Sequence, residues 1–117
     1  MKKAPYYPGE WRIEEMDLFD KEMLDLDGEE ACIVVHRNLQ GRLQFDGVHG
    51  WIDCRVELVG DVERLEFTWE GTNGSHPSSG RGWGVVKGSV MVGRIYIHNG
   101  DDSSFRAVVR TLRSEDA

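Results

Sequence analysis

The chain has only two cysteines and no long apolar run. Cys32 and Cys54 fall on predicted strands with a third strand between them, which places their backbones roughly 9–10 Å apart, beyond disulfide reach. We therefore predict two reduced thiols and a cytoplasmic location. No apolar segment follows the N-terminal lysines, and no run approaches the length of a membrane span, so we expect neither a secretory signal nor a membrane helix.

The chain also has few positive charges. It contains 14 lysines and arginines against 21 acidic residues, which gives a net charge of −7. Nucleic-acid binding requires cations that replace the counterions around phosphate, and anionic membrane surfaces attract basic segments. We therefore expect neither partner. Three arginines near the C-terminal end, Arg106, Arg110 and Arg113, are interpreted as the solvent face of the last strand.

Motifs for metal or phosphate binding are missing as well. Cys32 and His36 lie four residues apart on a predicted strand, about 13 Å, which is too far to share one ion. The acidic stretch Asp25–Glu30 lacks the spacing of a calcium loop. The glycines at 80, 82 and 84 begin a strand instead of joining a strand to a helix. We predict no metal and no cofactor.

What the sequence does contain is a series of hairpin signals. Asp46-Gly47 and Gly60-Asp61 each separate two alternating segments, as two-residue turns do. Folding on these turns brings apolar pairs to one face: Phe45–Val48, Leu43–Gly50, Val56–Leu65, Cys54–Phe67 and Ile52–Trp69. The other face pairs opposite charges: Arg55–Glu66 and Glu57–Arg64. Because a slip of one residue would destroy both patterns, this register is strongly specified.

The second half of the chain continues the pattern. We predict a loop over Gly71–Gly80, because the stretch is rich in glycine, serine and asparagine. A three-residue turn, Lys-Gly-Ser, then sets Val85 against Met91 and Trp83 against Gly93. A connection over Asn99–Ser103 sets Ile97 against Phe105 and Ile95 against Ala107. This longer connection is preferred to a two-residue Asn-Gly turn, which would bury an aspartate against the core. Arg94, Tyr96 and His98 then face outward.

Two strands and a helix are predicted upstream. Glu10–Glu15 forms a first strand with Trp11 and Ile13 inward. Residues 30–37 form a second strand that is apolar on both faces, so its inward face stays open. Between them, Met16, Phe19, Met23 and Leu26 recur at helical spacing, which indicates a short helix with a core-facing stripe.

Eight antiparallel strands in sequence leave two exposed edges unless the sheet closes. We therefore predict an all-β fold, an eight-stranded up-and-down barrel with one short helix after the first strand. One domain accounts for residues 1–117, with tails over residues 1–8 and 112–117.

The segment "GEW", Gly9 to Trp11, resembles the G-x-W motif of the lipocalin-like calycins. That resemblance implies that Trp11 packs under an arginine of the last strand, Arg110 or Arg113. The helical insert is similar to the fatty-acid-binding branch. Separately, "EFTWEG", "SGRGWG" and "IHNGDDSSF" resemble a family of small bacterial proteins of unknown function, over Trp11 to Arg110. This second likeness implies a bacterial origin and brings no activity.

The favoured function is non-enzymatic binding of a small apolar or amphipathic ligand inside the barrel. Eight strands enclose space that side chains just fill or that holds one small ligand, and the sequence leaves both outcomes open. The loop Gly71–Gly80 is either a gate at one mouth or a plain connector. The predicted ligand-binding residues are Trp11, Phe45, Phe67, Trp69, Trp83, Ile95 and Phe105.

Two alternatives belong to other functional classes. One is a protein-interaction module, with a possible homodimer, that uses exposed Trp51, Tyr96 and the acidic rim. The other is a small acid–base enzyme in which His98, oriented by Asp101, acts as a general base with Arg81 across the rim. Asn, Gly, Asp and Ser are the residues that turns use, so the segment around His98 is interpreted as a hairpin end.

Overall fold

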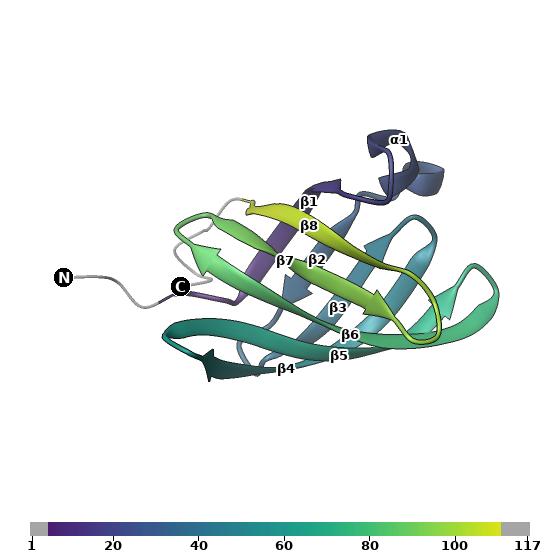
Figure 1. Cartoon of the computed structure of the whole chain (residues 1–117). Helices are drawn as coiled ribbons and strands as arrows, with labels where there is room; N and C mark the ends of the chain where they lie inside the picture. Colours follow the sequence, from purple (N-terminus) through teal and green to yellow (C-terminus); the bar gives the residue numbers. More distant parts are fainter. Residues whose placement is uncertain (1–4, 111–117) are drawn as a thin grey trace.

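The computed structural model describes residues 5–110 as a closed barrel of eight antiparallel strands (Figure 1). Each strand pairs with its neighbours in sequence, and β1 also pairs with β8, which closes the ring. The predicted fold class is therefore confirmed. The strands are β1 Gly9–Met16, β2 Cys32–Val35, β3 Gln40–Phe45, β4 Val48–Val59, β5 Val62–Asn73, β6 His76–Lys87, β7 Val90–Ile97 and β8 Asp102–Val109.

The insert after β1 contains the expected short helix, α1 Lys21–Leu24, followed by a 3-10 turn, η1 Leu26–Gly28. The predicted helical stripe is wrong. Met16 is buried at the end of β1, whereas Met23 and Leu26 are exposed, and Leu24 is the buried residue of the helix. Because α1 makes only one turn, it is too short to present a repeating apolar face.

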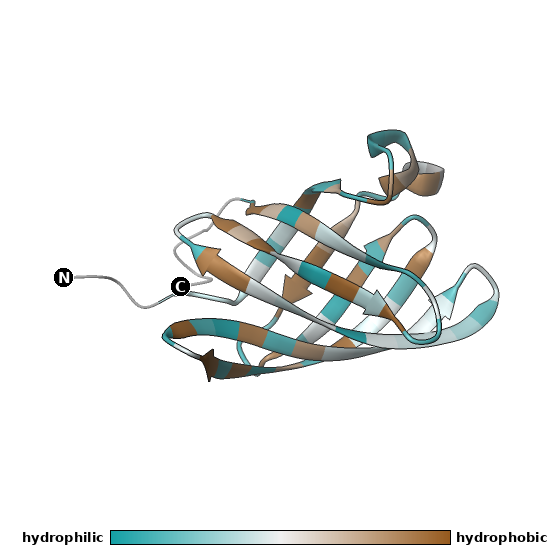
Figure 2. Cartoon of the chain, viewed as in Figure 1, coloured by the Kyte–Doolittle hydropathy of each residue, from teal (hydrophilic) through white to brown (hydrophobic). Residues whose placement is uncertain are grey.

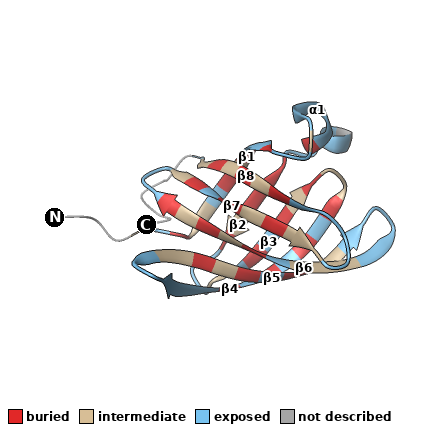
Figure 3. Cartoon of the chain, in the orientation of Figure 1, coloured by how far each residue is buried: buried red, intermediate tan, exposed pale blue. Residues whose placement is uncertain are grey.

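The register of the first two hairpins is confirmed. Phe45 lies opposite Val48 across the Asp46-Gly47 turn, and Val59 lies opposite Val62 across the Gly60-Asp61 turn. The charge pairs on the outer face also form as cross-strand neighbours, Arg55 with Glu66 and Glu57 with Arg64. Figure 3 shows the alternation of buried and exposed positions along these strands that the two-residue period requires.

The predicted loop over Gly71–Gly80 is wrong, because β5 and β6 continue through it as one hairpin. Asn73 lies opposite His76 across a two-residue turn whose first residue, Gly74, has a φ of 63°. Pro77 has no N–H to donate. At this position of β6 an N–H would point away from β5, toward the side where pairing with β7 begins only at Gly80, so no hydrogen bond between strands is lost. Pairing with a neighbouring strand here overrides a composition typical of loops.

The β6–β7 register differs by one residue from the prediction. The turn contains two residues, Gly88-Ser89, with Gly88 at a φ of 61°. As a result Trp83 lies opposite Arg94 and faces outward, and the expected pairing of Trp83 with Gly93 does not form. The Arg64 guanidinium stacks on the Trp83 ring at 4.4 Å from its centroid.

The β7–β8 register differs by four residues from the prediction. Because four is an even number, the same side chains still face inward, but their partners change. Ile95 lies opposite Ser103, and Gly93 lies opposite Phe105. Ser103 is buried, and its hydroxyl accepts a hydrogen bond from the Leu18 N–H (3.1 Å) and donates one to the Ser104 carbonyl (2.9 Å). A serine whose hydroxyl is fully bonded is cheap to bury, which permits the shorter connection.

Two further features concern the β1–β2 side of the barrel. In β2, Ile33 and Val35 face the interior, while Cys32 lies on the outer side beside the Arg42 guanidinium (3.8 Å).

The predicted N-terminal tail includes Tyr7, but Tyr7 is buried, and its carbonyl accepts a hydrogen bond from the Trp11 indole (2.8 Å). The assigned C-terminal tail and Arg113 lie outside the described residues.

Candidate functional site

Six of the seven predicted ligand-binding residues line the barrel interior, and Trp83 is the exception. Each of the six is at most 4% exposed, and all belong to one apolar cluster: Trp11, Phe45, Phe67, Trp69, Ile95 and Phe105. Figure 2 shows the apolar positions alternating with polar ones along the strands.

The interior is tightly packed where these side chains meet glycines of the adjacent strands. A β-carbon added to Gly50 would lie 2.7 Å from the Trp69 ring, and one added to Gly82 would lie 2.5 Å from the Phe67 ring. The rings therefore occupy the space that the glycines leave. An internal ligand would have to displace them, at the cost of core packing. The internal ligand stays a prediction, and this packing argues against it.

The predicted catalytic residues are not brought together. His98 is exposed at the β7–β8 turn, where its backbone N–H donates to the Ser79 carbonyl (2.8 Å). Arg81 instead stacks on the Tyr96 ring, 4.2 Å from the centroid. Within residues 5–110, no hydrogen bond or ion pair joins the side chains of His98, Asp101 and Arg81. The turn interpretation therefore fits the structure.

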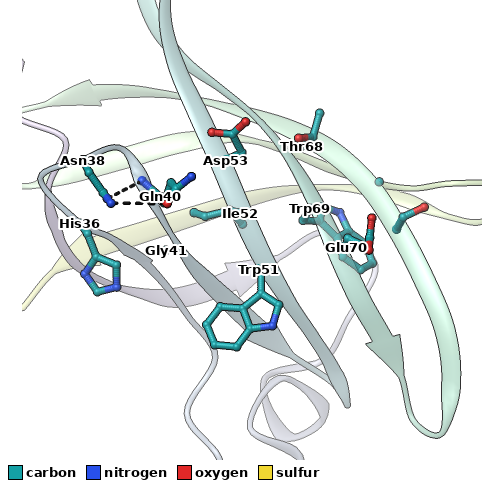
Figure 4. A pocket seen from close by; sticks show the side chains of 12 residues that line it. His36, Asn38, Gln40, Gly41, Trp51, Ile52, Asp53, Thr68, Trp69 and Glu70 are labelled. Atoms are coloured by element: carbon teal, nitrogen blue, oxygen red, sulfur yellow. Dashed lines mark hydrogen bonds between the residues drawn. The ribbon is translucent and has the colours of Figure 1, made fainter.

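A groove of about 710 Å³ lies on the outer face of β3–β6 (Figure 4). The strand register places its outward side chains in two rows, one containing Gln40, Asp53 and Thr68 and the other Trp51, Glu70 and Ser79. The β2–β3 turn forms one end. The lining comprises His36, Asn38, Gln40, Gly41, Trp51, Ile52, Asp53, Thr68, Trp69, Glu70, Ser79 and Gly80.

Trp51 is the most prominent side chain of the groove. It is 73% exposed, as the sequence predicted, and its ring projects from β4 into solvent (Figure 4). Glu70 lies directly opposite it on β5, and Arg42 lies opposite it on β3. The Arg42 guanidinium turns toward Gln44 (3.1 Å) and Cys32. The indole face is therefore flanked by a carboxylate on one side.

The β2–β3 turn gives the groove a defined end. Leu39 adopts a φ of 65°, and the His36 N–H donates to the Gln40 carbonyl (2.7 Å), which tightens the turn. The Asn38 carboxamide oxygen accepts the Gln40 N–H (3.0 Å). These bonds fix the polar residues of the turn at the edge of the groove, with His36 exposed beside it.

The electrostatic character of the groove is acidic. Its lining contains the carboxylates of Asp53 and Glu70 and no lysine or arginine. Neither carboxylate forms an ion pair with another residue of the described chain. A second outer groove, of about 770 Å³, differs in this respect. Its cations Arg94 and Arg106 are each paired with an acid, Asp102 (2.6 Å) and Glu14 (2.5 Å).

Sequence reasoning identified Trp51 as exposed but missed its neighbours. The signal was available in the β4–β5 register, because pairing Ile52 with Trp69 also places Trp51 against Glu70 and Asp53 against Thr68. The position of His36 at the groove could not be predicted from the sequence, because it depends on the path of the β2–β3 turn. Of the two arginines that the calycin resemblance places over Trp11, Arg110 binds Glu10 (3.5 Å) and Glu30, and Arg113 lies outside the described residues.

Comparisons with known proteins add no relative. No protein-family model matches the chain, and no curated protein or solved structure matches it significantly. The resemblances to calycins and to the small bacterial family therefore stay predictions. Across residues 5–110, no three side chains of His, Cys, Asp or Glu are placed to share a metal ion. The same residues include no helix that combines the length and apolar character needed to span a bilayer.

Proposed function

We propose that this protein is a non-catalytic interaction module that binds a cationic side chain of a partner protein in the groove around Trp51. The observation that supports this most directly is the exposed indole on the wall of a groove that holds two carboxylates and no cation. Aromatic residues on an open strand face are typical of interfaces, where tryptophan often dominates the binding energy. Two buried free thiols suit an intracellular setting.

The chemistry of the groove favours arginine or lysine. A guanidinium or ammonium group over an indole face gains about 0.5–2 kcal/mol from the ring quadrupole. Glu70, across from Trp51, and Asp53, two residues further along β4, supply acceptors for charge-assisted hydrogen bonds. The net charge of −7 attracts cationic partners over a longer range. A neutral ligand would gain less from either carboxylate, because hydrogen bonds between two charged groups are stronger.

The test is an NMR titration of the isotope-labelled protein with N-acetyl-arginine amide, and with the neutral analogue N-acetyl-citrulline amide. We expect the arginine probe to shift the Trp51 indole and the backbone amides of Asp53 and Glu70. The citrulline probe, which has the same shape without the charge, should leave these signals in place because the carboxylates gain nothing from it.

Variants separate the groove from general charge attraction. Trp51→Ala and the pair Asp53→Asn with Glu70→Gln should each abolish the shifts. The pair Asp20→Asn with Glu22→Gln removes the same charge at α1 and should preserve them. Equal shifts with both probes, or shifts that persist in Trp51→Ala, would contradict the proposal.

A further inference from the structure

β4 extends well beyond the strand that covers one of its sides. β3 pairs with β4 only over Val48 to Asp53, and the last bond on that side joins the Cys54 N–H to the Leu39 carbonyl (2.8 Å). β4 continues to Val59, paired with β5 alone. The end of this hairpin therefore protrudes from the barrel as a strand with one open side, at the left of Figure 1.

The backbone of this segment presents hydrogen-bonding groups to the open side. Successive residues of a strand direct their N–H and C=O groups to opposite sides. Since Cys54 bonds toward β3, the groups of Val56 and Leu58 point the same way. Within residues 5–110, no strand pairs with that side of Val56 or Leu58. The protruding edge is a template for another strand.

Three of the five side chains of residues 55–59 are apolar and exposed, and the other two are the opposite charges Arg55 and Glu57. Leu58 is 72% exposed and Val56 is 41% exposed on one face, while Val59 and Val62 are exposed on the other. Figure 2 shows the end of β4 as hydrophobic, and Figure 3 shows it as exposed. Natural edges are blunted by lysine, proline or bulges, and residues 55–59 contain neither lysine nor proline.

The charges of the segment identify the partner. Arg55 and Glu57 flank Val56 symmetrically, so the segment is neutral in a chain of net charge −7. In an antiparallel two-fold pairing centred on Val56, Arg55 lies opposite Glu57 of the second copy, and the same pair forms again by symmetry. Opposite charges in cross-strand positions stabilise a sheet, whereas a partner segment of uniform charge would meet one like charge.

We propose that two copies of this chain associate along the open edge of β4, centred on Val56. The pairing joins the two β4–β5 hairpins over Arg55 to Glu57 of each copy, because Leu39 already bonds to Cys54 on that side and limits the contact to these residues. It satisfies the free backbone groups of Val56 and covers part of its exposed side chain and that of Leu58. This interface is separate from the groove around Trp51 and does not depend on the function proposed for that groove.

Sedimentation equilibrium over a concentration series tests the pairing. The wild type should rise from the monomer mass of 13.3 kDa toward twice that value. Arg55→Glu and Glu57→Arg each place like charges opposite one another, and each should weaken self-association about tenfold or more, equivalent to about 1.4 kcal/mol. An equimolar mixture of the two variants restores both opposite-charge pairs and should associate again.

The double variant Arg55→Glu with Glu57→Arg distinguishes this register from others, because exchanging the two charges keeps the pairs about Val56 complementary. It should associate more strongly than either single variant, although each exchanged charge then lies opposite a like charge on β5, Glu66 or Arg64. Val56→Pro removes the N–H on the open side while sparing the bonds to β5, and should abolish association. Trp51→Ala should leave it unchanged. A wild type that stays monomeric at the highest concentration, or association indifferent to both single charge reversals, would overturn the proposal.

Discussion

At the scale of single residues, burial decides what the two thiols can do. Cys54 faces the core, and burial, reinforced by the charge of Asp53, raises its pKa to about 12. Cys32 lies on the outer side of β2, yet burial raises its pKa as well, against the opposing effect of Arg42. Because the thiolate is the reactive form, neither side chain is suited to nucleophilic chemistry in the folded protein.

This argument predicts slow alkylation of Cys54 in the native state. In Cys32→Ser, which leaves one thiol, iodoacetamide at about pH 8 should react on the order of a thousandfold more slowly than in denaturing guanidinium, because the thiolate fraction falls with the raised pKa. Mass spectrometry of timed samples measures both rates. Cys54→Ser provides the same comparison for Cys32. Native and denatured rates of similar size would show that the Cys54 site opens freely.

At the scale of elements, one carboxylate makes several of the bonds that hold the short insert between β1 and β2. Asp25 accepts two hydrogen bonds from the Arg12 guanidinium, at 2.7 and 2.5 Å, and one from the Ala31 N–H (2.9 Å). The hydrogen bonds from Arg12 are the main reason that the pKa of Asp25 is lowered, against the opposing effect of burial. Asp25 thereby joins the middle of the insert to Arg12 of β1 and to Ala31 at the end of the insert.

We expect Asp25→Asn to destabilise the protein by about 1–3 kcal/mol at neutral pH, the usual range for hydrogen bonds to a charged group. Since the folded pKa lies below the unfolded one, the contribution is complete above about pH 5 and disappears as the pH falls through the folded pKa. The stability difference between wild type and variant should therefore narrow in acid, as measured by urea unfolding at several pH values. Asp20→Asn, an exposed acid beside α1, should change stability by less than about 0.5 kcal/mol. A gap that persists unchanged in acid would contradict this role for Asp25.

The elements also show how far sequence reasoning reaches. The β4–β5 register could be predicted because both faces constrain it, with apolar pairs inside and Arg55–Glu66 outside. In β6 only one face has large side chains, and the prediction assumed that Trp83 had to be buried. The interior positions are instead Gly82 and Gly84, because Phe67 and Met91 already fill that space. Interior volume depends on facing strands, so it cannot be deduced from β6 alone.

At the scale of the whole molecule, the inward side chains of the described residues form one apolar cluster, and the grooves discussed above lie on the outer face. An eight-stranded barrel is just wide enough for side chains, and here aromatic rings pack against inward glycines of the adjacent strands. The groove around Trp51 contains two carboxylates and no lysine or arginine in its lining, whereas the second groove contains Arg94 and Arg106, each paired with an acid. The long dimension of 45 Å reflects the twelve-residue strands β4, β5 and β6. β4 extends beyond its neighbour β3, which leaves the open edge of β4.

A barrel filled with side chains and a hollow carrier should respond differently to a small apolar molecule. Benzene should not raise the melting temperature of the wild type, because no apolar space is free to receive it. Phe67→Ala should lose about 3–5 kcal/mol and leave an apolar cavity. Benzene that binds this cavity stabilises the folded state by mass action, so the variant should recover several degrees in a melting experiment. Met23→Ala, an exposed truncation, leaves no cavity and should not respond, and Phe67→Leu offers a milder test of the same site. If benzene stabilised the wild type as much as the variant, the barrel would already contain the space that an internal ligand needs, and the binding site would belong inside.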